Sequence, residues 1–281
     1  MTAVVTDRVQ APFGARAARV VGAERHGAYI VLRCSDPGGP RPAAGQFYML
    51  RAAERWGGGV DERPYLPRAF SVLRAPVQTD ELHFLIEDVG PGTARLCELG
   101  AGDELMLVGP LGIGFAPPRQ GRRPLLAGGG VGIAPLAIWQ DELGAEAAAR
   151  GAEMPPALLG FRDAAHAPGA ALLHGATVAT DDGSVGHHGL VTALLAAELD
   201  ADPHAEVYAC GPPPMLEAVR ALCAEREVPA QLALESGMAC GYGACFGCVV
   251  PTTDGYIRLC VDGPVIDAAR LETALTPGAG H

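Results

Sequence analysis

The stretch GMACGYGACFGC, residues 237–248, places three cysteines and three interior glycines on one short loop, and a fourth cysteine comes after a further eleven residues. The spacing C-x4-C-x2-C is typical of plant-type [2Fe–2S] ligation, whereas structural zinc sites usually take closely spaced cysteine pairs from two separate turns. Interior glycines permit the tight bend that such a loop needs. We therefore expect a [2Fe–2S] cluster, with zinc or unliganded thiols as the alternatives. The expected ligands are Cys240, Cys245, Cys248 and Cys260.

The residues upstream of this loop alternate between short apolar runs and segments of helical pattern. From about residue 122, runs such as RPLLAGGG (123–130) and AEVYACG (205–211) are each followed by a helical segment, and a final strand is expected over 230–236. Strand–helix alternation of this kind predicts a parallel sheet with right-handed crossovers. The second half of the chain is therefore expected to be an α/β domain that precedes the cysteine loop.

The first half of the chain has a different pattern. Residues 16–115 consist mainly of short β-type runs, such as AYIVLRC (28–34) and LHFLIEDV (82–89), broken by glycine and proline. Many short strands separated by turn signals predict an antiparallel barrel or sandwich. The chain is thus expected to combine an all-β domain, an α/β domain and a small cysteine-rich domain.

Composition and charge limit the classes of partner. A chain of 281 residues is long enough for two or three domains, and its formal net charge of −11 argues against nucleic acid and anionic membranes as partners. There is no apolar run of about 18 residues, so we expect no transmembrane helix, and the N-terminal residues lack the apolar stretch of a signal peptide. We expect a cytoplasmic protein, whose eight cysteines are thiols or metal ligands rather than disulfides.

Two turns in the α/β half are candidates for nucleotide binding. The stretch LLAGGGVGIAPL (125–136) puts glycines between a buried strand and a helix, where backbone N–H groups and the helix dipole favour a pyrophosphate. The stretch YACGPPPML (208–216) lies at a second strand–helix junction. A tight turn without a ligand and a proline-rich helix start are the alternative interpretations. The candidate residues are Gly128, Gly129, Gly130, Gly132, Cys210, Gly211 and Pro212.

Two stretches in the β half are candidates for a second ligand. RAFSV (68–72) offers an arginine, an aromatic ring and a hydroxyl on one strand, and GPGTARL (90–96) is a glycine turn that enters a short helix. An ordinary strand and ordinary helix capping by Thr93 explain the same residues equally well.

Taken in order, these stretches resemble the ferredoxin–NADP reductase superfamily and, within it, the electron-transfer subunits of NAD-dependent dihydroorotate dehydrogenases. The resemblance covers about residues 15–265, and its most specific part is MACGYGACFGCVV followed by RLCVDGPV. It implies an antiparallel FAD-binding barrel, a parallel-sheet NAD-binding domain and a C-terminal [2Fe–2S] domain. The implied divisions are a tail (1–14), the barrel (15–118), the nucleotide domain (119–234), the cluster domain (235–270) and a second tail (271–281).

The resemblance also implies roles for individual residues. The implied FAD contacts are Arg68, Ala69, Phe70, Ser71, Leu85, Ile86, Glu87, Gly90, Gly92 and Thr93, and the glycine turn and the CGP stretch would hold NAD. Two departures from the family are Ala69, where proline is frequent, and Glu87, where a basic residue is frequent. NAD is favoured over NADP: Arg162 could meet a 2′-phosphate, whereas Asp181 and Asp182 could meet ribose hydroxyls.

The function implied is electron relay through cofactors, without a Ser/His/Asp type catalytic site. Nicotinamide moves two electrons as hydride and a [2Fe–2S] cluster moves one, so a flavin is required between them. The expected partner is the FMN-containing catalytic subunit that oxidises dihydroorotate to orotate in pyrimidine biosynthesis, in a heterotetramer of two plus two chains. The alternatives are a reductase subunit of a ferredoxin-coupled transhydrogenase, hydrogenase or other oxidoreductase, and a zinc-bearing interaction protein without enzymatic activity.

Overall fold

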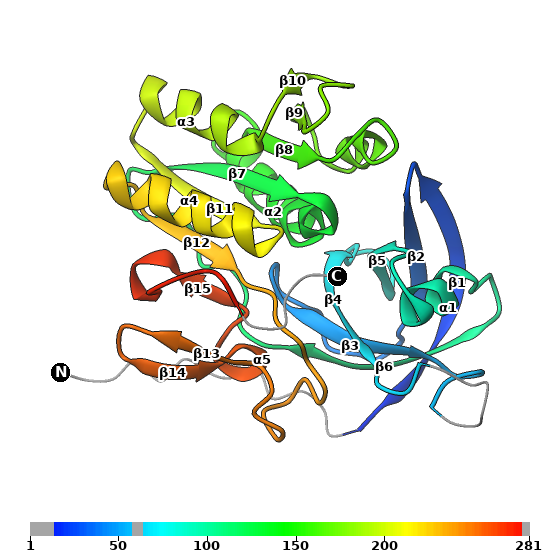
Figure 1. Cartoon of the computed structure of the whole chain (residues 1–281). Helices are drawn as coiled ribbons and strands as arrows, with labels where there is room; N and C mark the ends of the chain where they lie inside the picture. Colours follow the sequence, from blue (N-terminus) through cyan, green and yellow to red (C-terminus); the bar gives the residue numbers. More distant parts are fainter. Residues whose placement is uncertain (1–13, 58–63, 277–281) are drawn as a thin grey trace.

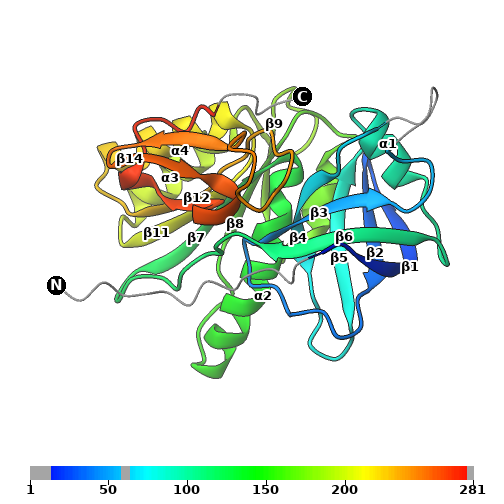
Figure 2. The same ribbon diagram turned by 90° about the horizontal axis from the view of Figure 1, so that it is seen from below.

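The structure is a computed structural model that describes residues 14–57 and 64–276. Most of the expected N-terminal tail and the last five residues of the expected C-terminal tail lie outside the described residues. In the described part, a β-barrel and an α/β sheet lie side by side, and the cysteine-rich segment packs beside both (Figure 1 and Figure 2). No helix among the described residues combines the length and hydrophobicity that crossing a membrane requires.

The N-terminal half forms a closed antiparallel barrel with the strand order β1-β2-β5-β4-β3-β6. Closure leaves no unpaired strand edge. Its interior is filled by fully buried side chains such as Leu32, Tyr48 and Phe84. The elements are β1 (Arg16–His26), β2 (Tyr29–Ser35), β3 (Phe47–Ala52), β4 (Arg68–Arg74), β5 (Glu81–Glu87), α1 (Pro91–Cys97) and β6 (Glu104–Leu111).

The second half contains a seven-stranded sheet with the order β10-β9-β8-β7-β11-β12-β15. All neighbouring strands run parallel except β15, which pairs antiparallel with β12 at one edge. The strands are β7 (Arg123–Gly129), β8 (Ala157–Phe161), β9 (Thr177–Thr180), β10 (His187–His188), β11 (Ala205–Cys210), β12 (Ala230–Ala233) and β15 (Val265–Asp267). The helices are η1 (Gly130–Gly132), α2 (Ile133–Ala149), η2 (Ala167–Leu172), α3 (Val191–Ala201) and α4 (Pro213–Glu225).

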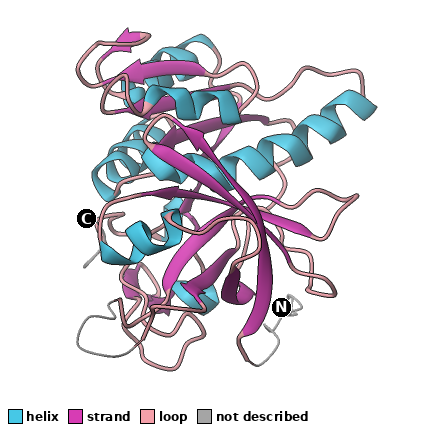
Figure 3. Cartoon of the chain, turned by 90° about the vertical axis from the view of Figure 1, so that its right-hand side faces the viewer, coloured by secondary structure: helices cyan, strands magenta, loops and turns pink. Residues whose placement is uncertain are grey.

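Both faces of this sheet are buried, because the helices lie on both sides of it. On β7, Leu126 belongs to the hydrophobic core that includes Trp139 of α2 and the barrel, whereas Leu125 belongs to the core that includes α3 and α4. Neighbouring residues of a strand point to opposite faces, so a run of consecutive apolar residues is what a doubly covered strand needs. In Figure 3 the barrel strands lie below most of the helices.

The cysteine-rich segment follows β12 and forms its own small hairpin. It contains β13 (Val249–Thr252), β14 (Gly255–Arg258), α5 (Leu259–Asp262) and η3 (Ala268–Arg270), and it ends by supplying β15 to the large sheet. The expected fold class, an antiparallel barrel, a parallel sheet and a small C-terminal domain, is confirmed. The expected strand over 230–236 is shorter than predicted: β12 ends at Ala233, where its pairing with Val265 of β15 also ends.

Candidate functional site

A cavity of ≈ 490 Å³ lies where the barrel meets the carboxyl end of the sheet. Ligands of open α/β sheets bind outside the carboxyl ends of the strands, so the cavity has the expected place for a cofactor. Its wall comes from β4 and β5, the turn into α1, the turns after β7 and β11, and the segment that follows β12. The two halves of the chain therefore form this site jointly.

The barrel side of the cavity contains nine of the ten residues for which the resemblance implied FAD contacts. These nine are Arg68, Ala69, Phe70, Ser71, Leu85, Glu87, Gly90, Gly92 and Thr93. Ile86, the tenth, does not line the cavity and is fully buried in the barrel. The reason is strand geometry: Leu85 and Glu87 face the cavity, so the residue between them faces the opposite way.

Arg68 and Gly92 lie against each other at the start of α1. A Cβ added at Gly92 would lie 2.8 Å from Nε of Arg68, so only glycine leaves the guanidinium in its present place. The hydroxyl of Thr93 accepts a hydrogen bond from the Val89 N–H (2.9 Å) and donates one to the Gly90 carbonyl (3.0 Å), which holds the turn. An arginine whose side chain lies against such a turn suits the phosphate groups of FAD, since guanidinium pairs strongly with phosphate.

Ser236 is a further polar group on the cavity wall. Its Oγ is buried and has no hydrogen-bond partner among the described residues. A buried hydroxyl without a partner costs free energy, which a polar group of a bound cofactor would offset. Arg68 beside its glycine turn and the unpaired Ser236 hydroxyl fit the polar groups of a flavin cofactor.

On the sheet side, the expected NAD residues divide into two groups. Gly132 and Cys210 line the cavity, whereas Gly128, Gly129, Gly130, Gly211 and Pro212 do not. A Cβ at Gly132 would lie 2.5 Å from the Gly211 nitrogen and 2.6 Å from the Cys210 carbonyl oxygen, so this glycine allows the two turns to touch. Gly130 has a left-handed φ of 54° and open space around it, which leaves its backbone accessible to a phosphate. These turns fit a dinucleotide.

The thiol of Cys210 is kept neutral. Burial raises its pKa, and the carboxylate of Glu235 raises it further. A neutral thiol is a small, weakly polar surface rather than a nucleophile, so Cys210 suits contact with a planar ring.

The four cysteines of the C-terminal segment form two pairs. The Sγ atoms of Cys248 and Cys260 are 3.2 Å apart, and the side chain of Cys245 lies close enough to Cys240 to lower the pKa of its thiol. Within the described residues, no three His, Cys, Asp or Glu side chains are grouped around one point as a single ion would need. Two thiol pairs match a cluster of two irons, each of which takes two thiolates, better than they match a single zinc ion.

The backbone of the loop favours charged sulfur. Burial acts to raise the pKa of Cys240, but N–H groups of Cys245, Tyr242 and Ala244 lower it to about 7. Gly241 and Gly243 have left-handed φ values of 80° and 86°, conformations that glycine adopts without steric cost. The loop thus bends its amides toward the thiols, as a thiolate-ligated cluster requires.

The sequence of this fold and site is similar to that of known proteins. The chain is 34% identical over 261 residues to the dihydroorotate dehydrogenase B (NAD(+)), electron transfer subunit, of Caldanaerobacter subterraneus subsp. tengcongensis, with 90% of this chain and 97% of that protein covered. The chain belongs to the family of electron transfer subunits of dihydroorotate dehydrogenase B. Another electron transfer subunit of this family, from Geobacillus thermodenitrificans, is 37% identical over 257 residues, which are 86% of this chain and 89% of that protein.

The family model of the iron–sulfur cluster binding domain of dihydroorotate dehydrogenase B matches residues 235–272, a range that contains all four cysteines of the two pairs. Among solved structures, the NADH-dependent reduced ferredoxin-NADP oxidoreductase has a TM-score of 0.75 at 23% identity, with 93% of this chain and 92% of that one covered. The ferredoxin reductase of carbazole 1,9a-dioxygenase has a TM-score of 0.63 at 22% identity, with 76% and 66% covered. This chain therefore has a ferredoxin reductase fold, and the expected resemblance is confirmed.

Sequence reasoning missed one wall of the cavity in this family member. The segment from Ala233 to Met238 lines it, together with Phe47, Val131 and Pro264. A usable signal was present, since this segment directly follows the last parallel strand, at the sheet edge where ligands bind. The predicted extension of that strand through residue 236 obscured it.

Proposed function

We propose that this chain is the electron-transfer subunit of a dihydroorotate dehydrogenase, holding FAD in the cavity, a [2Fe–2S] cluster on the four cysteines, and NAD on the glycine turns. The observation that carries the proposal is the shared wall of the cavity, in which the arginine strand of the barrel faces the nucleotide turns of the sheet. FAD supplies the exchange between two-electron hydride chemistry and one-electron chemistry. The residues of the chain bind and orient the reacting groups.

In this function, Arg68 neutralises phosphate charge, and the side chains of Ser71 and Ser236 offer hydrogen bonds in the cavity. Apolar neighbours such as Phe47 and Leu85 exclude water, which strengthens these polar contacts. Gly132 keeps the nucleotide turn next to Cys210, so the nicotinamide end of NAD is expected on this side of the cavity. Positioning, rather than acid–base chemistry, is the contribution of the protein.

We propose that the catalytic partner docks over the cysteine loop. Tyr242 and Phe246 of this loop are 60% and 63% exposed, and Cys245 beside them is exposed. Exposed aromatic residues are enriched at the centres of protein interfaces. The guanidinium of Arg258 lies 5.3 Å from the centre of the Phe246 ring and holds it in place.

The partner proposed is an FMN-containing subunit that converts dihydroorotate to orotate, in an assembly of two chains of each kind. The balance is dihydroorotate plus NAD⁺ to orotate plus NADH plus one proton. The four cysteines would hold a cluster that supplies one-electron transfer from the partner, and the residues of the cavity and of the glycine turns would hold the groups that exchange two electrons with NAD⁺. The relatives are named as electron transfer subunits, which supports a separate catalytic chain as the electron source.

The test is anaerobic co-expression with a candidate FMN dehydrogenase subunit from the same genome, followed by analysis of iron, sulfide, FAD and FMN. The proposal predicts that dihydroorotate bleaches the flavin spectrum and that added NAD⁺ is converted to NADH. Reduction by NADH without any response to dihydroorotate would instead indicate a reductase subunit of another oxidoreductase. A colourless protein that contains zinc and no flavin would refute both functions.

A further inference from the structure

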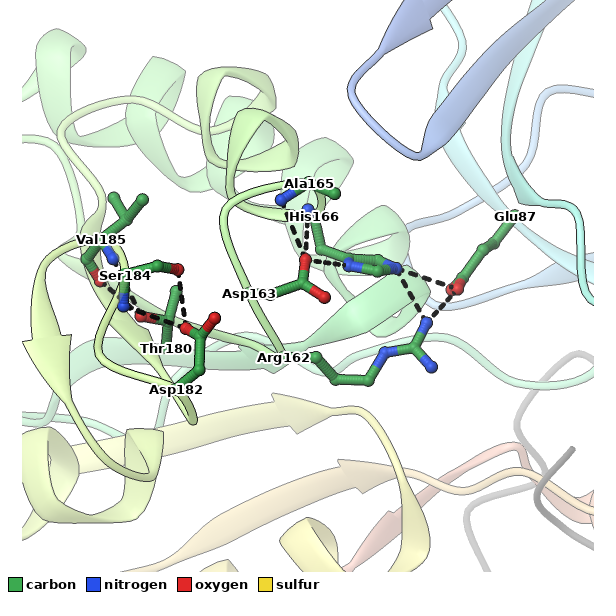
Figure 4. Close-up of polar contacts among 9 residues, drawn as sticks. All are labelled: Glu87, Arg162, Asp163, Ala165, His166, Thr180, Asp182, Ser184 and Val185. Atoms are coloured by element: carbon green, nitrogen blue, oxygen red, sulfur yellow. Dashed lines mark hydrogen bonds and ion pairs between the residues drawn. The ribbon is translucent and has the colours of Figure 1, made fainter.

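Glu87 of the barrel reaches across the cavity mouth to the nucleotide sheet. It is the last residue of β5, its side chain is 18% exposed, and its Oε1 accepts a hydrogen bond from Nη2 of Arg162, the residue that follows β8 (Figure 4). The same Oε1 lies 3.2 Å from Nε2 of His166. One carboxylate thus pairs with two basic side chains of the other domain.

His166 fixes this arrangement from the opposite side. Its Nδ1 lies 2.6 Å from Oδ1 of Asp163, and its ring packs edge-on against Tyr29 with 5.6 Å between ring centres. The ring is therefore held between two carboxylates, and only 12% of the side chain is exposed. His166 thus holds the Glu87 carboxylate in place, and the more exposed guanidinium of Arg162 pairs with that fixed carboxylate.

The strand order places the adenosine half of a bound dinucleotide at this contact. In the order β9-β8-β7-β11, the turn after β7 suits the pyrophosphate, and Cys210, the last residue of β11, lines the flavin cavity. With the nicotinamide on the β11 side, the adenosine must extend over the carboxyl ends of β8 and β9. Arg162 lies after β8, and its carbonyl accepts a hydrogen bond from the N–H of Asp182 after β9.

The charge at these strand ends is mostly negative. Residues 162–190 contain one arginine and no lysine, but they contain Asp163, Asp181 and Asp182. The hydroxyl and N–H of Ser184 lower the pKa of Asp182, so that this carboxylate is ionised at neutral pH (Figure 4). A 2′-phosphate would add further negative charge here, and Arg162, the one arginine of this segment, is already paired with Glu87.

We propose that Glu87, a residue of the flavin barrel, determines the preference for NAD over NADP by withholding Arg162 from a 2′-phosphate. The inference rests on the proposed function, because it assumes that the sheet binds a pyridine nucleotide. A 2′-phosphate must displace the Glu87 carboxylate from Arg162, whereas the 2′-hydroxyl of NAD does not. The discrimination arises from the displaced ion pair and from the neighbouring aspartates.

The test compares Glu87→Gln with the unchanged protein, because glutamine keeps the shape and removes the charge. Calorimetry on the holoprotein gives the Kd of ADP-ribose and of its 2′-phosphorylated form, a readout that needs no flavin chemistry. We expect Glu87→Gln to lower the Kd of the 2′-phosphorylated form, relative to the Kd of ADP-ribose, by about fivefold. The effect is modest because Arg162 is 65% exposed and exposed ion pairs contribute little. The ratio of kcat/KM for NADPH to that for NADH should rise accordingly.

Two further variants test whether Arg162 is responsible for the change in the Kd ratio and whether the change is specific to Glu87. Adding Arg162→Ala to Glu87→Gln should abolish the gain, since the released arginine is what meets the phosphate. Glu198→Gln is the matched control: Glu198 also pairs with an arginine, Arg123, but Arg123 begins β7, at the amino end of the strands and away from the site at their carboxyl ends. The inference is wrong if Glu87→Gln leaves the Kd ratio unchanged or if the gain survives Arg162→Ala. Failure of nucleotide binding is a separate outcome, in which the unchanged protein binds neither ADP-ribose nor NADH. Failure of the response to dihydroorotate would leave the comparison of the two Kd values unaffected.

Discussion

Cys248 and Cys260 are brought to a Sγ–Sγ distance of 3.2 Å by the β13–β14 hairpin. Cys248 directly precedes β13, and Cys260 directly follows the first residue of α5, so both lie at the open end of the hairpin, where Val249 pairs with Arg258. The Leu259 N–H donates to the Cys248 carbonyl at 3.1 Å, which closes the hairpin beside the two thiols. Strand pairing, rather than proximity in sequence, sets this half of the cluster site.

Replacing Cys260 by alanine is expected to abolish the cluster while FAD remains bound. The variant loses one of four ligands, whereas neither cysteine of this pair lines the cavity. Iron and acid-labile sulfide should fall to background, and NADH should still bleach the flavin. Cys223→Ala is the control, since Cys223 is equally buried on helix α4 but has no cysteine partner. Equal iron content in the two variants would contradict the assignment.

Gly92→Ala is expected to weaken FAD binding by about tenfold, the effect of disturbing one charge-assisted hydrogen bond. The new Cβ would displace the Arg68 guanidinium, which can move because it ends a flexible side chain, so the fold should survive. The measurement is the Kd of FAD from flavin fluorescence on reconstitution. Gly100→Ala, where a Cβ meets nothing within 4 Å, should bind FAD as the unchanged protein does. If Gly92→Ala binds FAD with an unchanged Kd, the assignment of Arg68 to the FAD phosphates is wrong.

Gly132→Ala is expected to lower the free energy of unfolding by about 1–3 kcal/mol, the usual cost of overpacking. Its Cβ would collide with backbone atoms of Cys210 and Gly211, and a backbone cannot rotate away as a side chain can. Urea unfolding measures the loss. Val131→Ala, at the neighbouring exposed position, should be nearly neutral, and a similar loss in both variants would argue against the backbone contact.

Glu217 is expected to make stability depend on acid pH. Hydrogen bonds from Arg220, from the Ala274 N–H and from the Thr273 hydroxyl lower its pKa to about 2, against the burial that acts to raise it. Because the folded pKa lies below the unfolded one, the contribution is fully present above the unfolded pKa. It is lost as the pH falls from about 4.5 toward 2.

The corresponding measurement is the free energy of unfolding of Glu217→Gln and of the unchanged protein, from urea denaturation at pH 7 and near pH 3. The difference between the two proteins should be larger at pH 7 and shrink at the lower pH. Glu225→Gln serves as control, because Glu225 ends the same helix and is 77% exposed. A difference that is independent of pH would contradict the role of the Glu217 carboxylate in holding the segment around Thr273.

Much of the site was accessible to sequence reasoning because its signals are local. The spacing from Cys240 to Cys248 is a property of one loop, and Gly92 and Arg68 belong to short motifs. Residues 85–87 were expected to contact the flavin through their backbone, and the strand geometry adds that the side chains of Leu85 and Glu87 line the cavity whereas that of Ile86 does not. Ser236 was missed because its burial depends on where β12 ends, which the pairing with β15 decides.

The sequence by itself determined the three-part architecture, the four-cysteine set and the two glycine turns. These follow from short-range patterns, since apolar periodicity and ligand spacing do not depend on distant residues. The tertiary structure alone decided that Gly132 lets two turns touch, and that Glu87 of the barrel reaches Arg162 of the sheet. Such contacts join residues that are 75 or more positions apart, and their geometry arises only when the packed domains exclude other arrangements.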